Sequence, residues 1–357
     1  MKKVKMLCID GGGIRGVIPA TIIKYVEEKA QQLSNNPDLR IADLFDFIAG
    51  TSTGGILTCL YLTPQSENGS TKTSKYTAEE ALSLYVDHGY DIFNRSKIRF
   101  YDLKMMFNAT QYSPRYLEKV AHDKFGDLKI SELTKPALIT TYNLQTGSTF
   151  FFSSREPKSK NREFYVRDVA RSTSAAPTYF PPARIKNLAD PKHKMMNLDG
   201  GVFANNPTMC AYAEVRDTKE GPIQAPSAEN MIILSVGTGG GHLKINGVSK
   251  SKGWGLLKWA QHTPDIMMDG SADTVAYQIQ SIFNTLGKKG RHQYLRVDVP
   301  DALRDSYSSD MGDASPNNIM NLQKAALESL NHSIEHKGLD KFIELLVKEA
   351  AKESTTV

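Results

Sequence analysis

Long apolar runs and cysteine are both scarce in this sequence of 357 residues. No run approaches the roughly 18 apolar residues that a membrane-spanning helix requires. The basic start of the chain is typical of a signal peptide, but the apolar stretch that follows stops before Asp10, so we expect no secretory signal. The few cysteines include no CxxC pair, which favours buried, reduced thiols of a cytoplasmic protein over a disulfide scaffold, a redox site or a metal site. They are Cys8, Cys59 and Cys210.

Charge of one sign is also only in slight excess. The chain has 44 Lys and Arg against 39 Asp and Glu, a net charge of +5. This excess suits attraction to an anionic surface and does not require a nucleic-acid partner. Hydrophobic residues make up 40% and charged residues 23%, proportions that exclude a disordered or collagen-like chain and allow a sizeable core.

Alternating strand-like and helix-like segments predict the fold class. An apolar strand at 4–9 precedes a glycine turn and apolar residues at helical spacing over 18–33. A short strand at 44–49 precedes another glycine turn and an apolar helix at 56–62. Two such units predict βαβ connections and a mostly parallel sheet sandwiched by helices, an α/β fold in a single domain. Further predicted strands are 137–144, 149–153, 195–198 and 231–236, and further predicted helices are 78–93, 114–125, 166–176, 317–335 and 339–352.

The first glycine turn is Asp10-Gly11-Gly12-Gly13-Ile14-Arg15-Gly16, which matches G-x-G-x-x-G. Between a strand and a helix, this pattern can bind a dinucleotide. The second predicted strand, however, ends at Ala49-Gly50 without the acidic residue that a dinucleotide fold uses there. More generally, such a turn gathers backbone N–H groups at a helix N-terminus, where they can hold any negative oxygen. We favour this second interpretation.

The second glycine turn is Gly50-Thr51-Ser52-Thr53-Gly54, which matches G-x-S-x-G between a strand and an apolar helix. This is the context of a nucleophile elbow, in which small neighbours permit a sharp turn that exposes the Ser52 Oγ. The dipole of the following helix favours negative charge that develops beside it. A turn that merely connects a strand to a helix is the alternative.

A third motif, Asp199-Gly200-Gly201, also follows a predicted strand. An aspartate in this position can point into a crevice shared with other strand ends, although an Asx turn gives the same pattern. If the three motifs converge on one edge of a parallel sheet, they provide a base, a nucleophile and oxyanion donors, which are the parts of an acyl-transfer site.

Together, in this order, the three motifs resemble the signatures of the patatin-like phospholipases. The segments 171–181, 233–239, 254–259 and 294–297 also resemble this family, so the similarity extends along nearly the whole chain. The resemblance implies a fold related to the α/β-hydrolases and to the catalytic domain of cytosolic phospholipase A2. In that fold, 5–211 is the catalytic region, and 212–357 is the remainder of the same domain with C-terminal helices.

The resemblance also implies the chemistry. Ser52 is the nucleophile and Asp199 the proton acceptor of a Ser–Asp dyad that cleaves acyl esters of membrane glycerophospholipids, with no metal or cofactor. The oxyanion hole is assigned to Gly11, Gly12, Gly13, Ile14, Arg15 and Gly16, the nucleophile elbow to Gly50, Thr51, Thr53 and Gly54, and the DGG motif to Gly200 and Gly201.

Two histidine patterns offer competing chemistry. His242 follows Ser52 and Asp199 in the chain order of an α/β-hydrolase triad, although a lone histidine is more often a surface or packed residue. The sequence His332-Ser333-Ile334-Glu335-His336 fits H-x-x-E-H, and its two histidines could share a zinc ion. Little chain remains after it to provide a third ligand.

Expected partners follow from charge and from the resemblance. Arg15 either stabilises its loop or attracts a phosphate or acyl headgroup, and the alternative is a solvated surface arginine. The segment 250–259 combines lysines with Trp254 and Trp259. Such a basic cluster is most often a solvated loop, and tryptophans are often core residues, but an interfacial membrane contact is the functional alternative. We expect an acyl-lipid substrate, peripheral attachment to a phospholipid surface during turnover, and no nucleic-acid polymer.

Two other roles remain open. In one, the chain is a cyclic-nucleotide-activated antiviral effector that degrades the cell membrane, with a small nucleotide as its activator. In the other, it is a non-catalytic lipid-binding module, which is disfavoured because Ser52 and Asp199 are both present.

Overall fold

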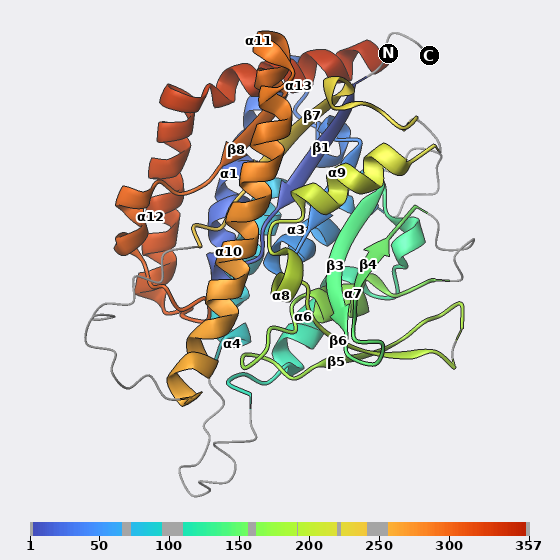
Figure 1. Cartoon of the computed structure of the whole chain (residues 1–357), viewed down its shortest axis with the longest axis vertical. Helices are drawn as coiled ribbons and strands as arrows, with labels where there is room; N and C mark the ends of the chain where they lie inside the picture. Colours follow the sequence, from blue (N-terminus) through green and yellow to red (C-terminus); the bar gives the residue numbers. More distant parts are fainter. Residues whose placement is uncertain are drawn as a thin grey trace, which may run out of the picture.

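A computed structural model describes residues 3–65, 73–94, 110–155, 162–190, 192–219, 223–240 and 256–354. These residues form one eight-stranded sheet with helices on both faces (Figure 1). The strands are β1 (Val4–Ile9), β2 (Phe47–Gly50), β3 (Ala137–Asn143), β4 (Ser148–Ser153), β5 (Ala183–Lys186), β6 (Lys194–Asp199), β7 (Met231–Val236) and β8 (Tyr294–Val297). The predicted α/β fold with a mostly parallel sheet is confirmed.

The centre of the sheet is parallel, in the order β3-β2-β1-β7-β8. Ile9 at the end of β1 is paired with Gly50 at the end of β2 and with Val236 at the end of β7. Val236 is in turn paired with Val297 at the end of β8. Because these strands end at the same level, the two glycine turns and the loop after β7 lie side by side at one edge of the sheet.

The third motif, Asp199-Gly200-Gly201, does not follow a parallel strand as we expected. Asp199 ends β6, which runs antiparallel to β3, with Asp199 opposite Thr141. The first half of β3 is paired with β2, up to Gly50 opposite Ile139, so β6 occupies the stretch of β3 that extends beyond the end of β2. Its carboxyl end therefore points back toward the turn after β2. The motifs converge, but not as three ends of parallel strands.

Helices cover both faces of the sheet, and alternate residues of β1 show the two cores. Leu7 and Ile9 pack in the larger core with α1, α3, α4, α6, α12 and α13, whereas Met6 and Cys8 pack in a smaller core with α9 and α10. Figure 1 shows α9 and α10 on the near face and α1 and α3 behind the sheet. Within the described residues, the α-helices are α1 (Val17–Ser34), α2 (Ile41–Leu44), α3 (Thr53–Leu62), α4 (Ala78–Ile92), α6 (Arg115–Phe125), α7 (Val166–Thr173), α8 (Gly201–Ala204), α9 (Thr208–Asp217), α10 (Leu256–Asn284), α11 (Gly287–Gly290), α12 (Pro316–His332) and α13 (Leu339–Ser354).

Most predicted elements are present within a few residues of their expected bounds, and β7 has the bounds predicted for it. The second C-terminal helix is separated from α12 by a π-helical turn, Ser333–Lys337. The sequence predicts no element at β5, β8, α9 or α10. Among the described residues, no helix is both long enough and apolar enough to cross a membrane. All three cysteines are free, with Cys8 and Cys59 buried and Cys210 partly exposed.

Candidate active site

Ser52 occupies a sharp turn between β2 and α3. Its backbone has φ 54° and ψ −121°, a conformation that residues with a side chain rarely adopt, and Ser52 precedes the first residue of α3. The turn also needs glycine on both sides. A Cβ on Gly50 would lie 2.2 Å from the Gly54 carbonyl oxygen, and a Cβ on Gly54 would lie 2.2 Å from the carbonyl oxygen of Ile9. The chain therefore adopts a strained conformation that presents one hydroxyl at a helix N-terminus.

The Ser52 hydroxyl points at Asp199. Ser52 Oγ donates a 2.5 Å hydrogen bond to Asp199 Oδ2, and the backbone N–H of Gly201 donates a 2.7 Å bond to the other carboxylate oxygen, Oδ1. Asp199 is 1% exposed. Burial raises the pKa of Asp199 to about 7, and the two hydrogen bonds offset only part of that rise. A carboxylate with this pKa is a far better proton acceptor near neutral pH than an exposed aspartate.

The segment that includes α7 supports both residues. Thr173 Oγ1 accepts a 2.8 Å hydrogen bond from the Ser52 backbone N–H, and the Ala175 carbonyl accepts a 3.0 Å bond from the Asp199 backbone N–H. Thr173 itself is fully buried. Thr173 and Ala175 lie in the segment 171–181 that resembles the family, although its sequence alone indicated no role for Thr173.

The first glycine turn lies directly beside this pair, since a Cβ on Gly11 would lie 3.0 Å from Ser52 Cβ. Its N–H groups are not equally available. Gly11 N–H already donates to the Asn205 carbonyl at 3.1 Å, and Ile14 N–H donates to the Met311 carbonyl at 2.9 Å. Arg15 N–H donates to the Gly12 carbonyl at 3.1 Å.

Because Gly11, Ile14 and Arg15 already use their N–H groups, fewer oxyanion donors are available than the sequence predicted. Within the described part of the chain, no hydrogen bond occupies the backbone N–H of Gly12 or Gly13. Thr53, as the first residue of α3, also has an N–H without an acceptor in its own helix. These groups can bind a negative oxygen that forms next to Ser52.

Arg15 is buried and is not a solvated surface arginine, which was the alternative interpretation of the sequence. It is 8% exposed, and its Nε has no hydrogen-bond partner in the described structure. A Cβ on Gly240, in the loop after β7, would lie 3.4 Å from Arg15 Nη2 and 2.8 Å from Asp269 Oδ1. The guanidinium therefore lies among the loops that surround the site.

Ser52 lines an apolar pocket. Most of its lining is hydrophobic and comes from α3, α4, α6 and the segment after α7. Its lining residues are Gly13, Ser52, Thr53, Ile56, Leu84, Tyr85, Gly89, Ile92, Phe93, Leu117, Ser174, Ala176, Tyr179, Phe180 and Met311. This apolar lining suits contact with an alkyl chain.

The other predicted features lie elsewhere. His242, Trp254 and Lys250 to Lys252 are outside the described residues, and the side chain of Trp259 is not described. The rings of His332 and His336 are 4.8 Å apart at the end of α12, where His336 contacts the exposed Glu335. In the described ranges, no group of three or more His, Cys, Asp or Glu residues could hold a metal ion.

Comparison with known proteins identifies the class. The family model for patatin-like phospholipases matches residues 7–212. "Patatin-like protein 2" of Oryza sativa subsp. indica is 33% identical over 362 residues, covering 95% of this chain and 87% of the relative. "Patatin-like protein 2" of Arabidopsis thaliana is 33% identical over 356 residues, covering 94% and 85%. The chain belongs to the patatin-like phospholipase family.

Membership alone does not establish turnover. "Probable inactive patatin-3-Kuras 1" of Solanum tuberosum is 31% identical over 360 residues, covering 96% of this chain and 92% of the relative. Whether this chain is active therefore depends on its own site residues.

Proposed function

We propose that the protein hydrolyses acyl esters of membrane glycerophospholipids through a Ser52–Asp199 dyad. The observation that carries this proposal is the 2.5 Å hydrogen bond from Ser52 Oγ to a buried carboxylate, beside an apolar pocket that Ser52 helps to line. The hydroxyl already donates to the carboxylate that would take its proton. The raised pKa of Asp199 also makes this carboxylate a suitable base.

The reaction then has two halves. Ser52 Oγ attacks the ester carbonyl while its proton passes to Asp199, and the resulting alkoxide is stabilised by the N–H groups of Gly12, Gly13 and Thr53. The C–O bond to the glycerol side breaks, and that oxygen takes the proton from Asp199. Water next attacks the acyl-enzyme and gives a proton to Asp199. Collapse of this second intermediate releases the fatty acid and returns the proton to Ser52.

The pocket supports a lipid acyl group as the substrate. It presents aliphatic and aromatic side chains from four elements, with Ser52, Thr53 and Ser174 at the few polar positions. Burial of a long acyl chain there gives about 0.8 kcal/mol per methylene. The net charge of +5 favours encounter with an anionic bilayer, so we propose peripheral attachment to the membrane surface during turnover.

Mixed phospholipid vesicles test the proposal directly. Wild-type protein should release free fatty acids and lysophospholipids that mass spectrometry identifies, and Ser52→Ala protein should release none. Parallel reactions with added cyclic dinucleotides separate a constitutive lipase from an effector that needs an activator. Equal release by wild type and Ser52→Ala, or release by neither with or without nucleotide, would contradict the proposal.

A further inference from the structure

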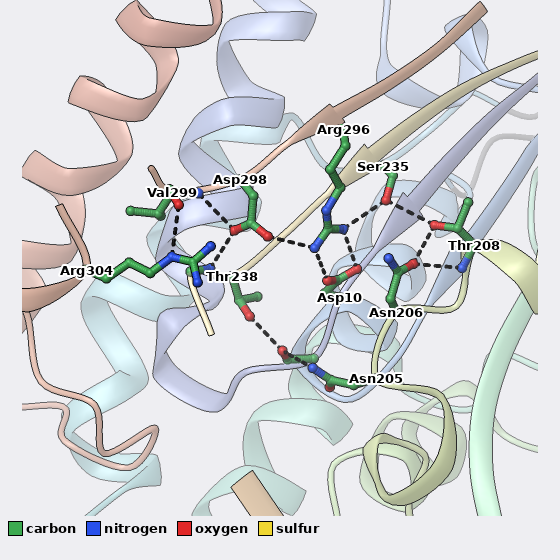
Figure 2. Close-up of polar contacts among 12 residues, drawn as sticks. Asp10, Asn205, Asn206, Thr208, Ser235, Thr238, Arg296, Asp298, Val299 and Arg304 are labelled. Atoms are coloured by element: carbon green, nitrogen blue, oxygen red, sulfur yellow. Dashed lines mark hydrogen bonds and ion pairs between the residues drawn. The ribbon is translucent and has the colours of Figure 1, made fainter. Parts of the chain in front are cut away.

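A partly buried polar network connects the first glycine turn with β7, β8 and the loops that follow these two strands (Figure 2). Arg296 of β8 is its centre. Its Nη1 donates to Asp10 Oδ1 at 2.9 Å and its Nη2 donates to Asp10 Oδ2 at 2.5 Å, a bidentate pair. Nη2 also donates to Asp298 Oδ2 at 2.7 Å. One guanidinium thus joins the residue that precedes the glycine turn to the chain that follows β8.

Asp298 extends the network to the loop after β7. Its Oδ1 accepts 2.9 Å hydrogen bonds from the backbone N–H groups of Gly239 and Val299. Gly237 leaves room for this carboxylate, because a Cβ there would lie 2.1 Å from Asp298 Oδ2. The Gly237 N–H also donates to the Val297 carbonyl at 2.8 Å, so hydrogen bonds hold the loop on both sides of Thr238.

Thr238 brings the network to the site. Its Oγ1 donates a 2.7 Å hydrogen bond to the carbonyl oxygen of Gly11, and Asn205 Nδ2 donates to the same oxygen at 3.3 Å (Figure 2). Thr238 is 2% exposed and Asn205 is 4% exposed. Two buried donors thus hold one carbonyl whose peptide unit also contains the N–H of Gly12.

Peptide planarity connects this carbonyl to catalysis. In a trans peptide the C=O and N–H of one unit point in opposite directions, so fixing the Gly11 oxygen also fixes the Gly12 N–H. A glycine-rich loop without such an anchor could rotate this unit at little cost. The Gly12 N–H is one of the groups that remain without an acceptor in the described structure.

We propose that Thr238 is a positioning residue that aims the Gly12 N–H at the oxyanion, and that Arg296 and Asp298 hold Thr238 and Asp10 in place for this purpose. The inference rests on the proposed esterase function. Thr238 lies in the loop after β7, outside the three glycine motifs. It acts on catalysis through the Gly12 N–H and does not contact the substrate.

The test compares Thr238→Val, which removes the hydroxyl at nearly constant volume, with Thr238→Ser, which keeps it. Thr218→Val is the matched control, because Thr218 is also buried and donates to a backbone carbonyl, Glu214 at 2.6 Å, just past the carboxyl end of α9. Each protein is assayed with a soluble short-chain ester. Its affinity is measured for an alkyl trifluoromethyl ketone, whose adduct with Ser52 carries an oxyanion, and for the matching ether, which cannot form an adduct.

Thr238→Val should lower kcat about 10- to 100-fold, with KM within about twofold, because a misaimed donor loses part of the 10²- to 10³-fold that one oxyanion donor provides. Affinity for the trifluoromethyl ketone should fall by a similar factor, while affinity for the ether stays constant. Thr238→Ser should retain most activity, and Thr218→Val should behave as wild type.

Four results would overturn the inference. Unchanged kcat in folded Thr238→Val rejects it, and so does an equal loss of affinity for ketone and ether, which indicates general disruption of the site. If Thr238→Val does not fold, Arg296→Lys keeps the charge without the bidentate fork, and an unchanged ketone affinity in that variant rejects the inference as well. A wild-type protein that cleaves no ester at all rejects the proposed function instead, and the inference with it.

Discussion

Ser52 Oγ and Asp199 Oδ2 lie 2.5 Å apart although the residues are 147 positions apart in the chain. The contact exists because β6 is paired with the part of β3 that projects beyond β2, and runs in the opposite direction. The carboxyl ends of β2 and β6 therefore face one another across the end of the sheet. The serine lies on a strained turn and the aspartate is buried. Both the strain and the burial have consequences that can be measured.

The strained backbone of Ser52 predicts a difference between two inactive variants. Ser52→Ala and Ser52→Gly both remove the hydroxyl, and each should lower ester hydrolysis by several orders of magnitude. Glycine tolerates φ 54°, ψ −121°, whereas alanine does not. We expect Ser52→Gly to be more stable than Ser52→Ala by about 1 kcal/mol, after the greater freedom of glycine in the unfolded chain is subtracted. Chemical denaturation of the two variants measures this difference, and equal stabilities would show that the turn is unstrained.

The pKa of Asp199 predicts the pH dependence of activity. Asp199 must be ionised to accept the Ser52 proton, and burial raises its pKa to about 7. The value of kcat/KM should therefore rise about tenfold per pH unit below about pH 7 and level off above it. Asp199→Asn should abolish this activity almost as completely as Ser52→Ala. A soluble short-chain ester reports the profile without changes in membrane binding, and a flat profile between pH 5 and 8 would contradict the assignment of Asp199 as base.

The same pKa shift predicts a pH dependence of stability with the opposite sign. The folded pKa of Asp199 exceeds the ordinary aspartate value of 3.8, so the folded state binds the proton more tightly than the unfolded chain does. Its contribution to the free energy of unfolding is therefore present below about pH 4 and is lost as the pH rises through about 7. Asp199→Asn cannot ionise at this position and should gain stability relative to wild type over this range.

Denaturation of both proteins between pH 4 and 8 measures that gain as a difference. Burial also raises the pKa of Asp10, to about 6, but this second carboxyl is present in both proteins and cancels. A constant difference across the range would show that Asp199 titrates at its ordinary pKa. Such a result would also remove the physical reason for its action as a base.

The local parts of the site could be predicted from the sequence, and the partners that orient them could not. Both glycine turns can be recognised in the sequence because a tight turn needs residues without bulky side chains at fixed positions. Asp199 is followed by two glycines for the same reason. Thr173, Thr238 and Arg296 are ordinary residues whose roles come from strand order and register. Their segments attracted notice only through similarity to a family, with no mechanism attached.

The long helix α10 shows a different limit of the sequence. It spans Leu256–Asn284 with Pro264 inside it, and it packs against the smaller core through Ile279 and Phe283 while Tyr277 is 74% exposed. Proline within an apolar pattern normally indicates the end of a helix, and the sequence predicts no helix in this region. Tertiary packing against α8 and α9 overrides that local signal.

Ile56 offers a test of the pocket itself. It lies one helical turn after Ser52 in α3, where its N–H donates to the Ser52 carbonyl at 3.0 Å, and its side chain lines the apolar pocket. Ile56→Phe should narrow the pocket close to the nucleophile, so kcat/KM for a long-chain ester should fall about 10-fold or more relative to a butyrate ester. Ile56→Ala should shift selectivity toward the bulkier or longer acyl group, at a cost of about 2–5 kcal/mol in stability if the space stays empty.

The ratio of the two activities is the informative quantity for Ile56, because overpacking or a cavity lowers the fraction of folded enzyme equally for both substrates. Melting curves taken with the kinetics identify that common loss. If the pocket holds the acyl chain, the long-to-short ratio changes in opposite directions in the two variants. A ratio that stays constant in both would place the acyl chain elsewhere, and would leave the Ser52–Asp199 pair without its proposed acyl-binding pocket.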